Sequence, residues 1–237
     1  MSRTFRYGAV VLAFSILAAA CGGGNGETTD PTDPAAEPVS GGTLKAAFDG
    51  GSDFFYGMNP SAEYYSVSWA FLRCCLTRTL LSYRGTPADE GGNELLPDLA
   101  TDQPTISDDG LTYTFTLKDG IMFGDPLNRE IVAEDFITAM NRVADPEASS
   151  GGYWFYYHGV VEGFAEAYDD EKLDEVSGIK AVDDKTLEIT LEEPIGAFPF
   201  LLAMPAMAPI PEELAKAHPK DIGQFLVSSG PYQWEGM

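Results

Sequence analysis

Two aromatic-rich segments contain the side chains best suited to binding a small molecule. The first, residues 53–59, ends in Met58 and Asn59, and the second, residues 151–158, places consecutive aromatic residues behind a glycine pair. Aromatic walls bury the apolar surface of a ligand, while tyrosine and tryptophan keep a polar group for hydrogen bonding. The alternative is that these side chains pack inside the fold. The residues predicted to line a ligand pocket are Phe55, Tyr56, Met58, Asn59, Tyr153 and Trp154.

No residue pattern in the chain indicates catalysis. The histidines His158 and His218 are far apart in the sequence, and neither stands in a metal-binding or nucleophile-activating pattern. Carboxylates are so abundant that many pairs could be named as a catalytic acid and base, and the sequence gives no reason to prefer one pair. We therefore predict a binding protein with no catalytic residues, no metal and no cofactor. A secreted hydrolase is the weaker alternative.

The adjacent cysteines Cys74 and Cys75 lie in an apolar run, residues 67–81, which predicts a buried helix. A disulfide between neighbours is rare, and a helix points successive side chains in different directions. A metal site needs further ligands at suitable spacing, and the sequence offers none nearby. We therefore predict two buried free thiols.

The N-terminus predicts export and anchoring. Arg3 and Arg6 precede a short apolar stretch, residues 8–19, which is too short to cross a bilayer as a helix and favours a cleaved signal. Small residues then lead to Cys21, and this arrangement resembles a bacterial lipobox, although Ala18 stands where leucine is usual. The resemblance implies a signal peptide over residues 1–20 and a lipid anchor on Cys21. The alternative is an ordinary secretory signal with an incidental cysteine.

The segment that follows, residues 21–42, is rich in Gly, Pro, Asp and Thr and has no periodic apolar pattern. Such a composition predicts a flexible tether. The formal net charge of −23 excludes nucleic acid as a partner, because binding phosphate requires a basic surface. A solvated acidic surface is the simplest interpretation of this charge.

The body of the chain predicts strands and helices in mixed order, hence an α/β fold with a mixed sheet. The turn Asp109-Gly110 precedes an alternating run, residues 112–117, that should bury Tyr113, Phe115 and Leu117 on one face. An amphipathic helix is expected over residues 133–143. Further expected elements are a strand over 43–48, a hairpin of 178–182 with 186–191, and short helices and turns from 194 to 226.

Several segments of this body resemble one known family. They include Leu-Pro-Asp-Leu-Ala at 96–100, Ser-Asp-Asp-Gly-Leu-Thr-Tyr-Thr-Phe-Thr-Leu-Lys-Asp-Gly at 107–120, and the residues 129–136, 178–189 and 229–232. In this order they resemble the extracellular solute-binding proteins of the peptide/nickel class, family 5, which are capture subunits of ABC importers. The similarity covers residues 41–237.

The resemblance implies a periplasmic-binding-protein-like fold of class II, or type C, in which two lobes close around a peptide or similar small solute. Members are much longer than this chain, so residues 43–237 are expected to form the N-terminal part of the first lobe, with the second lobe missing and ligand binding weak in the chain alone. The expected hinge toward the second lobe is Ser229, Gly230, Pro231 and Tyr232.

The same resemblance implies a lipid-anchored protein on the outer face of the cytoplasmic membrane. Its expected partners are a permease and ATPase subunits, and its contact with the membrane is through the lipid only. A surface receptor or chaperone on the same scaffold is the alternative. The residues do not separate peptides from nickel chelates or sugars.

Overall fold

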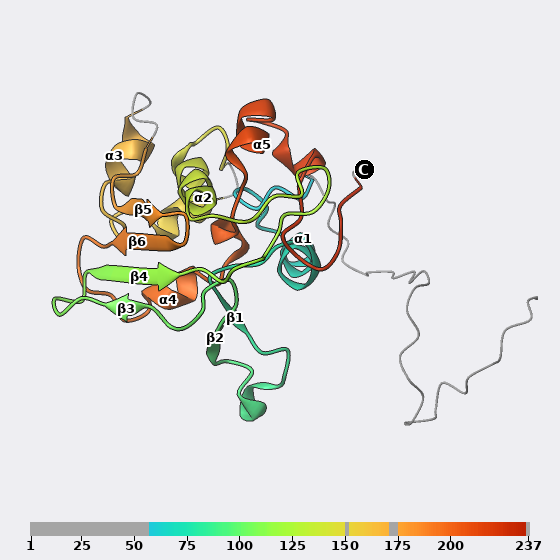
Figure 1. Cartoon of the computed structure of the whole chain (residues 1–237). Coiled ribbons are helices and arrows are strands. Elements are labelled where there is room, and N and C mark those ends of the chain that lie inside the picture. The colour runs from blue at the N-terminus through green and yellow to red at the C-terminus, as the bar shows by residue number, and fades with distance from the viewer. Residues whose placement is uncertain (1–56, 150–151, 171–174, 236–237) are drawn as a thin grey trace, which may run out of the picture. The chain divides into compact units, whose positions relative to one another are not determined.

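The computed structural model describes residues 57–149, 152–170 and 175–235 (Figure 1). These residues belong to one compact unit, Phe48–Met237. The predicted signal peptide, Cys21, the tether and the strand over 43–48 lie outside the described residues, as do Phe55 and Tyr56. Along the described chain, no helix is long and apolar enough to cross a membrane.

A four-stranded sheet forms one end of the unit. Its order is β3 (Thr105–Ile106), β4 (Thr112–Thr116), β6 (Thr186–Thr190) and β5 (Ile179–Asp183), and all its pairings are antiparallel. Gly110 adopts a φ of +76° in the turn between β3 and β4, a conformation that glycine reaches without steric cost. The two predicted hairpins are therefore confirmed, and they pair with each other through β4 and β6.

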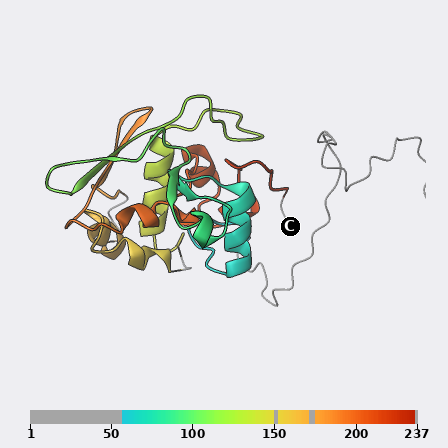
Figure 2. The same ribbon diagram turned by 90° about the horizontal axis from the view of Figure 1, so that it is seen from below.

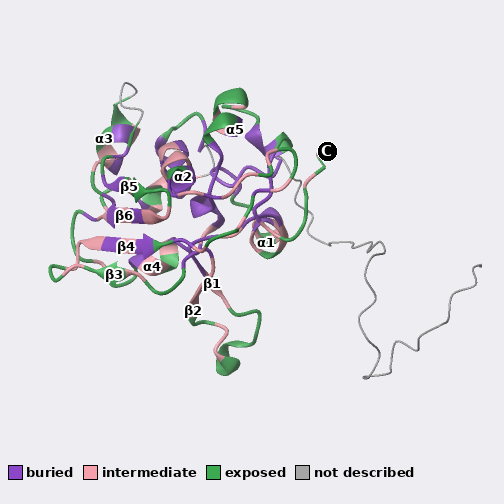
Figure 3. Cartoon of the chain, in the orientation of Figure 1, coloured by how far each residue is buried: buried purple, intermediate pink, exposed green. Residues whose placement is uncertain are grey.

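The alternation of apolar and polar residues decides which face of this sheet is buried. Tyr113 and Phe115 of β4 and Leu187 and Ile189 of β6 are at most 3% exposed, and Leu117 just beyond β4 is also buried. The threonines between them point to the opposite face. Figure 3 shows the buried residues gathering where β4, β6 and α2 meet. The predicted burial of one face is confirmed.

Helix α2 (Glu134–Ala144) packs against β5 and contributes Phe136, Met140 and Val143 to the main core. Glu134 lies in its first turn, where a negative charge interacts favourably with the helix dipole. The helix ends at Asp145, before Pro146, so the amphipathic helix predicted over residues 133–143 is confirmed.

The helix predicted over residues 67–81 is too long. Helix α1 (Ser66–Phe71) continues as a π-helical turn, η1 (Leu72–Leu76), and then stops. The backbone N–H and hydroxyl of Thr77 both donate to the carbonyl of Leu72, at 2.8 and 2.9 Å, which closes the turn. The chain then enters β1 (Leu81–Tyr83), which pairs with β2 (Leu95–Pro97). A continuous apolar run does not distinguish buried helix from buried strand, and strand pairing prevails at its end.

The prediction of buried free thiols is also wrong. Cys74 and Cys75 form a disulfide, Cys74 is exposed and Cys75 is half-buried. The prediction assumed a regular α-helix at this point, whereas the backbone here is the π-helical turn η1. Figures 1 and 2 place α1, which leads into this turn, at the opposite end of the unit from the four-stranded sheet.

Short helices and turns connect the remaining elements, as predicted for the proline-rich stretch after residue 194. Buried residues form a main core and a smaller cluster of Met58, Leu72, Leu76 and Leu226. The connecting elements are η2 (Ala88–Glu90), η3 (Tyr153–Tyr156), α3 (Phe164–Asp169), α4 (Phe198–Leu201), η4 (Pro205–Met207), α5 (Glu212–Ala217) and η5 (Ile222–Gln224).

Candidate functional site

The loop before α1 and the helix η3 meet, although they are far apart in the sequence. The hydroxyl of Tyr153 donates to the carbonyl of Glu63 at 2.9 Å, and the hydroxyls of Tyr64 and Tyr156 lie 2.5 Å apart. The rings of Tyr64 and Tyr153 are in edge contact, with centroids 5.0 Å apart. The structure therefore brings the second aromatic-rich segment, residues 151–158, against Glu63 and Tyr64, which follow the first segment in the chain.

Three of the four predicted pocket residues that the structure describes are buried. Met58 (2% exposed) packs in the smaller cluster, and Tyr153 is fully buried. The side-chain amide of Asn59 donates to the carbonyl of Ala148 at 3.2 Å, while its oxygen accepts from the backbone N–H of Ser61. These contacts fix the loop, and a direct ligand contact by Met58, Asn59 or Tyr153 stays a prediction.

Trp154 is half-buried and stacks on Tyr168, with ring centroids 4.6 Å apart. One face of its indole is therefore occupied by the protein itself. Ligand contact by Trp154 also stays a prediction.

The exposed aromatic surface at the junction consists of Tyr64 (47% exposed), Tyr65 (42%) and Phe155 (51%), together with the half-buried Tyr156. We call these four residues the tyrosine surface. Phe155 lies against Tyr156, with centroids 4.0 Å apart. The sequence prediction included Phe155 and Tyr156 in its second segment without choosing them as pocket residues, and it did not indicate Tyr64 or Tyr65. The Glu-Tyr-Tyr triplet following Asn59-Pro60-Ser61-Ala62 was the available signal, because consecutive tyrosines just before a helix cannot both face the core.

A buried carboxyl group lies next to this surface in the chain. Glu63 is fully buried, and its Oε1 accepts from the backbone N–H of Tyr65 at 3.2 Å. Among the described residues, its Oε2 and the buried hydroxyl of Ser61 have no hydrogen-bond partner. Burial raises the pKa of Glu63, against the opposing effect of hydrogen bonds from Tyr65 and Ser68. The site therefore holds polar atoms whose hydrogen-bonding capacity is unused.

The hydroxyls of Tyr64 and Tyr153 are neutral at physiological pH. The shared hydrogen bond with Tyr156 raises the pKa of Tyr64, and burial raises the pKa of Tyr153. A neutral phenol both donates and accepts a hydrogen bond. The surface thus offers flat apolar rings and uncharged polar groups, which suit a ligand with amide groups better than a highly charged one.

Replacing Tyr153 by phenylalanine tests the junction. The substitution removes the hydrogen bond to the Glu63 carbonyl while keeping the ring. We expect the free energy of unfolding to fall by about 1 kcal/mol, the usual value for one intramolecular hydrogen bond. Urea denaturation measures this value. Tyr83→Phe, at a partly exposed position, is the control. Equal urea midpoints for the two variants would show that the hydrogen bond from Tyr153 to Glu63 does not stabilise the fold.

The predicted hinge residues are docked on the π-helical turn. The backbone N–H groups of Ser229 and Gly230 both donate to the carbonyl of Leu76 at 3.0 Å, and that of Tyr232 donates to the carbonyl of Cys75 at 3.1 Å. The hydroxyl of Ser229 accepts from the backbone N–H of Arg78 at 2.9 Å. Pro231 and Tyr232 are exposed. A hinge role for residues 229–232 stays a prediction.

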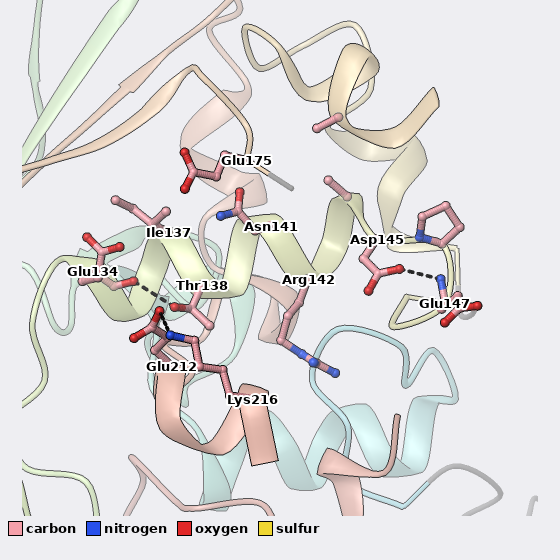
Figure 4. Close-up of a pocket in the computed structure, with 13 residues that line it drawn as sticks. Glu134, Ile137, Thr138, Asn141, Arg142, Asp145, Glu147, Glu175, Glu212 and Lys216 are labelled. Carbon is pink, nitrogen blue, oxygen red and sulfur yellow. Dashed lines mark hydrogen bonds and ion pairs between the residues drawn. The ribbon is translucent and has the colours of Figure 1, made fainter. Parts of the chain in front are cut away.

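A separate groove of about 670 Å³ runs along α2. Figure 4 shows Glu134, Thr138 and Asn141 on α2, with Glu212 and Lys216 on the neighbouring α5 paired to each other. Arg142 also lines the groove, but its Nη1 donates to the carbonyl of Pro219. The groove is mainly acidic and shares no residue with the tyrosine surface, so it is not the site that the aromatic segments predict.

The described residues contain no cluster of His, Cys, Asp and Glu able to hold a metal ion. His158 lies 3.5 Å from Asp169 and His218 lies 3.3 Å from Asp221, and both carboxylates are largely exposed. The best-defined feature with binding chemistry is therefore the tyrosine surface.

Comparison with known proteins matches this chain to one family. The model described as "Bacterial extracellular solute-binding proteins, family 5 Middle" matches residues 94–237. The glutathione-binding protein GsiB of Salmonella paratyphi A is 34% identical over 131 residues, which cover 55% of this chain and 22% of that protein. The oligopeptide-binding protein OppA of Bacillus subtilis is 39% identical over 135 residues, covering 54% and 23%.

Solved structures agree with these matches. The pheromone receptor PrgZ, a structure whose title concerns its mode of peptide binding, superposes with a TM-score of 0.65 at 26% identity, covering 76% of this chain and 34% of that one. An oligopeptide ABC transporter substrate-binding domain from Bacillus anthracis gives 0.64, again at 26% identity, with 74% and 32% covered. The predicted periplasmic-binding-protein-like α/β fold is confirmed. The chain spans about a quarter of the curated relatives and a third of these structures.

Proposed function

The chain belongs to family 5 of the bacterial extracellular solute-binding proteins, and we propose that it captures peptides or similar small solutes for an ABC importer. The observation that carries this proposal is the family match over residues 94–237. The relatives' names support the ligand class, since they are described as binding glutathione, dipeptides and oligopeptides. The family consists of binding proteins, which agrees with the prediction of a non-enzyme.

The tyrosine surface is the proposed contact region for the solute. An extended peptide presents alternating N–H and C=O groups, and a tyrosine hydroxyl, as on Tyr64 and Tyr156, can pair with either kind. The exposed ring of Phe155 covers an apolar side chain of the peptide. Contacts to main-chain groups and to flat rings depend little on peptide sequence, so we expect broad specificity.

The rest of the capture cycle follows from the family. The solute is enclosed when a second lobe closes over the tyrosine surface, with residues 229–232 as the hinge. The closed form delivers it to a permease, and separate subunits hydrolyse ATP. We also propose that residues 1–20 direct export and that Cys21 carries a lipid anchor. Residues 21–42 then tether the body to the outer face of the membrane.

Titration calorimetry tests the proposal on the complete protein, with both of the lobes that the family resemblance implies, because the chain alone is expected to bind ligand weakly. The ligands are glutathione and unmodified peptides of two to five residues. We expect at least one of them to bind with micromolar or tighter affinity. We also expect Tyr64→Ala and Tyr156→Ala to weaken this binding at least tenfold, because each removes a ring and a hydroxyl.

The matched control is Phe200→Ala. Phe200 is as exposed as Tyr64, at 47%, but its ring neighbour is Tyr83, outside the tyrosine surface. The Phe200→Ala variant should bind the peptide with the same affinity as the unmodified protein. Absence of binding to every ligand of the panel contradicts the proposed function, while binding that the tyrosine variants leave unchanged contradicts the proposed site.

A receptor role on the same scaffold is the second candidate, because PrgZ is described as a pheromone receptor. Peptide uptake by cells separates the two functions. An importer subunit makes accumulation of labelled peptide depend on this gene, whereas a receptor without transport does not.

A further inference from the structure

The disulfide between Cys74 and Cys75 lies at the boundary between solvent and the smaller cluster. Cys74 is exposed, so a dissolved thiol reaches its sulfur. Cys75 is half-buried and packs against the cluster of Met58, Leu72, Leu76 and Leu226, as does Trp234. One sulfur is therefore open to attack, while the other is attached to the interior.

Arg73, the residue before Cys74 in the chain, carries a positive charge. The guanidinium of Arg73 lies over the rings of Trp69 and Tyr83, with its central carbon 5.2 and 4.5 Å from their centroids. These two cation–π contacts hold the charge in place. A nearby cation favours the thiolate form of a thiol and attracts an anionic one.

The backbone at the disulfide carries the predicted hinge. The carbonyl of Leu76 accepts hydrogen bonds from the hydroxyl of Ser228 at 2.6 Å and from the N–H groups of Ser229 and Gly230. The carbonyl of Cys75 accepts from Tyr232. A Cβ added to Gly230 would lie 2.4 Å from that Cys75 carbonyl oxygen, so the two backbones are in close contact. Any movement of the backbone at residues 75–76 must therefore be felt at residues 228–232.

We propose that Cys74–Cys75 is a thiol–disulfide exchange site for a small anionic thiol, and that its redox state controls how firmly residues 228–232 dock on the π-helical turn. The disulfide closes a small covalent ring that fixes the backbone between the two cysteines. Opening the ring returns conformational freedom to that backbone. The four hydrogen bonds that converge on the carbonyls of Cys75 and Leu76 then lose their fixed acceptors.

The chemistry balances with two thiol molecules. The first, as thiolate, forms a bond to Sγ of Cys74, and the breaking disulfide leaves its electron pair on Sγ of Cys75, which takes up a proton. The second thiolate attacks the sulfur of the first, which releases Cys74 as a thiolate that is then protonated. The external thiols are oxidised to their disulfide, and Cys74 and Cys75 are reduced.

Hydrogen exchange in redox buffers tests the proposal without any peptide ligand, so its outcome is independent of the proposed transport function. The protein is equilibrated with mercaptoacetate, a small anionic thiol that is not a peptide, or with its disulfide, and alkylation followed by mass spectrometry counts the free thiols of the protein. We expect reduction to expose two thiols and to accelerate exchange at Ser229, Gly230 and Tyr232 at least tenfold. Amides of β4 serve as the internal control and should not change.

Two variants make the test specific. The double variant Cys74→Ser/Cys75→Ser should exchange rapidly at residues 229–232 in both buffers, because the ring is absent. Arg73→Gln should slow reduction by mercaptoacetate more than reduction by uncharged 2-mercaptoethanol. Reduction that leaves exchange at residues 229–232 unchanged overturns the coupling. Alkylation of both cysteines in the oxidised buffer overturns the site itself.

Discussion

Replacing Arg129 by leucine is expected to lower the free energy of unfolding by about 3 kcal/mol at neutral pH, at the lower end of the range for breaking a buried ion pair. Arg129 binds Asp135 through two nitrogens, at 2.6 and 3.0 Å, and Glu213 through two more contacts, at 2.6 and 3.0 Å. The Asp135 side chain is only 3% exposed. The variant leaves this carboxylate buried and without its cation, and it also removes the ion pair with Glu213 of α5.

The loss should depend on pH in a defined direction. Burial raises the pKa of Asp135, while the hydrogen bonds from Arg129 oppose the increase. Without Arg129 the native pKa rises further above the unfolded value of about 3.9. As the pH falls through this raised pKa, the native state takes up the proton before the unfolded state does. The deficit relative to the unmodified protein should therefore shrink between neutral pH and about pH 4.

Urea denaturation at several pH values measures this effect. Adding Asp135→Asn to the leucine variant should restore part of the stability, because the buried charge is removed. Lys220→Leu is the control: its ion pair with Glu147 is largely exposed, and we expect no resolvable change. A deficit that grows on acidification would contradict the assignment of Asp135 as the cause.

Replacing Gly230 by valine is expected to destabilise the protein by about 2–3 kcal/mol, the upper part of the range for overpacking. The added Cβ would lie 2.4 Å from the carbonyl oxygen of Cys75 and 2.8 Å from its carbonyl carbon. Backbone atoms cannot rotate away as a side chain can, so residues 228–232 must leave the π-helical turn. Their hydrogen bonds to Cys75 and Leu76 are lost at the same time.

Thermal and urea denaturation measure this loss, and hydrogen exchange locates it. The matched control is Gly85→Val, since nothing lies within 4 Å of a Cβ at Gly85. We expect rapid exchange at Ser229 and Tyr232 in the Gly230 variant only. Equal stability of the two variants would show that residues 228–232 are not docked as described.

Local patterns predicted the sheet region well. The alternation in residues 112–117 and the Asp-Gly turn fix both the strand and its buried face, because each depends on neighbouring residues only. Helix α2 follows from its apolar spacing and from Asp145-Pro146 for the same reason. The pairing of β4 with β6 joins hairpins distant in the sequence, and no local pattern specifies such a pairing.

The region around α1 could not be predicted in the same way. The run from residue 67 to residue 81 is largely apolar, and its division into helix, π-helical turn and strand depends on tertiary contacts. The hydrogen bonds from Ser228, Ser229 and Gly230 to Leu76 come from the far end of the chain. The disulfide of Cys74 and Cys75 was missed because it belongs to the non-α geometry of this turn.

Of the tyrosine surface, only Phe155 and Tyr156 fall in an aromatic-rich segment that the sequence indicated, whereas Tyr64 and Tyr65 lie outside both segments. Aromatic content identified residues 151–158, but composition does not tell which rings face solvent. The structure buries Met58 and Tyr153 and exposes Tyr64, Tyr65 and Phe155. Exposure is decided by how the loop before α1 meets η3, a contact between residues some ninety positions apart.

A crystal structure of the protein with a bound peptide tests the central claim most directly. The ligand is the tightest-binding peptide of the calorimetric panel. We predict a peptide main-chain group within hydrogen-bonding distance of the hydroxyl of Tyr64 or Tyr156, with a peptide side chain against Phe155. A peptide bound in the acidic groove along α2, or at any place without contact to the tyrosine surface, would contradict the account.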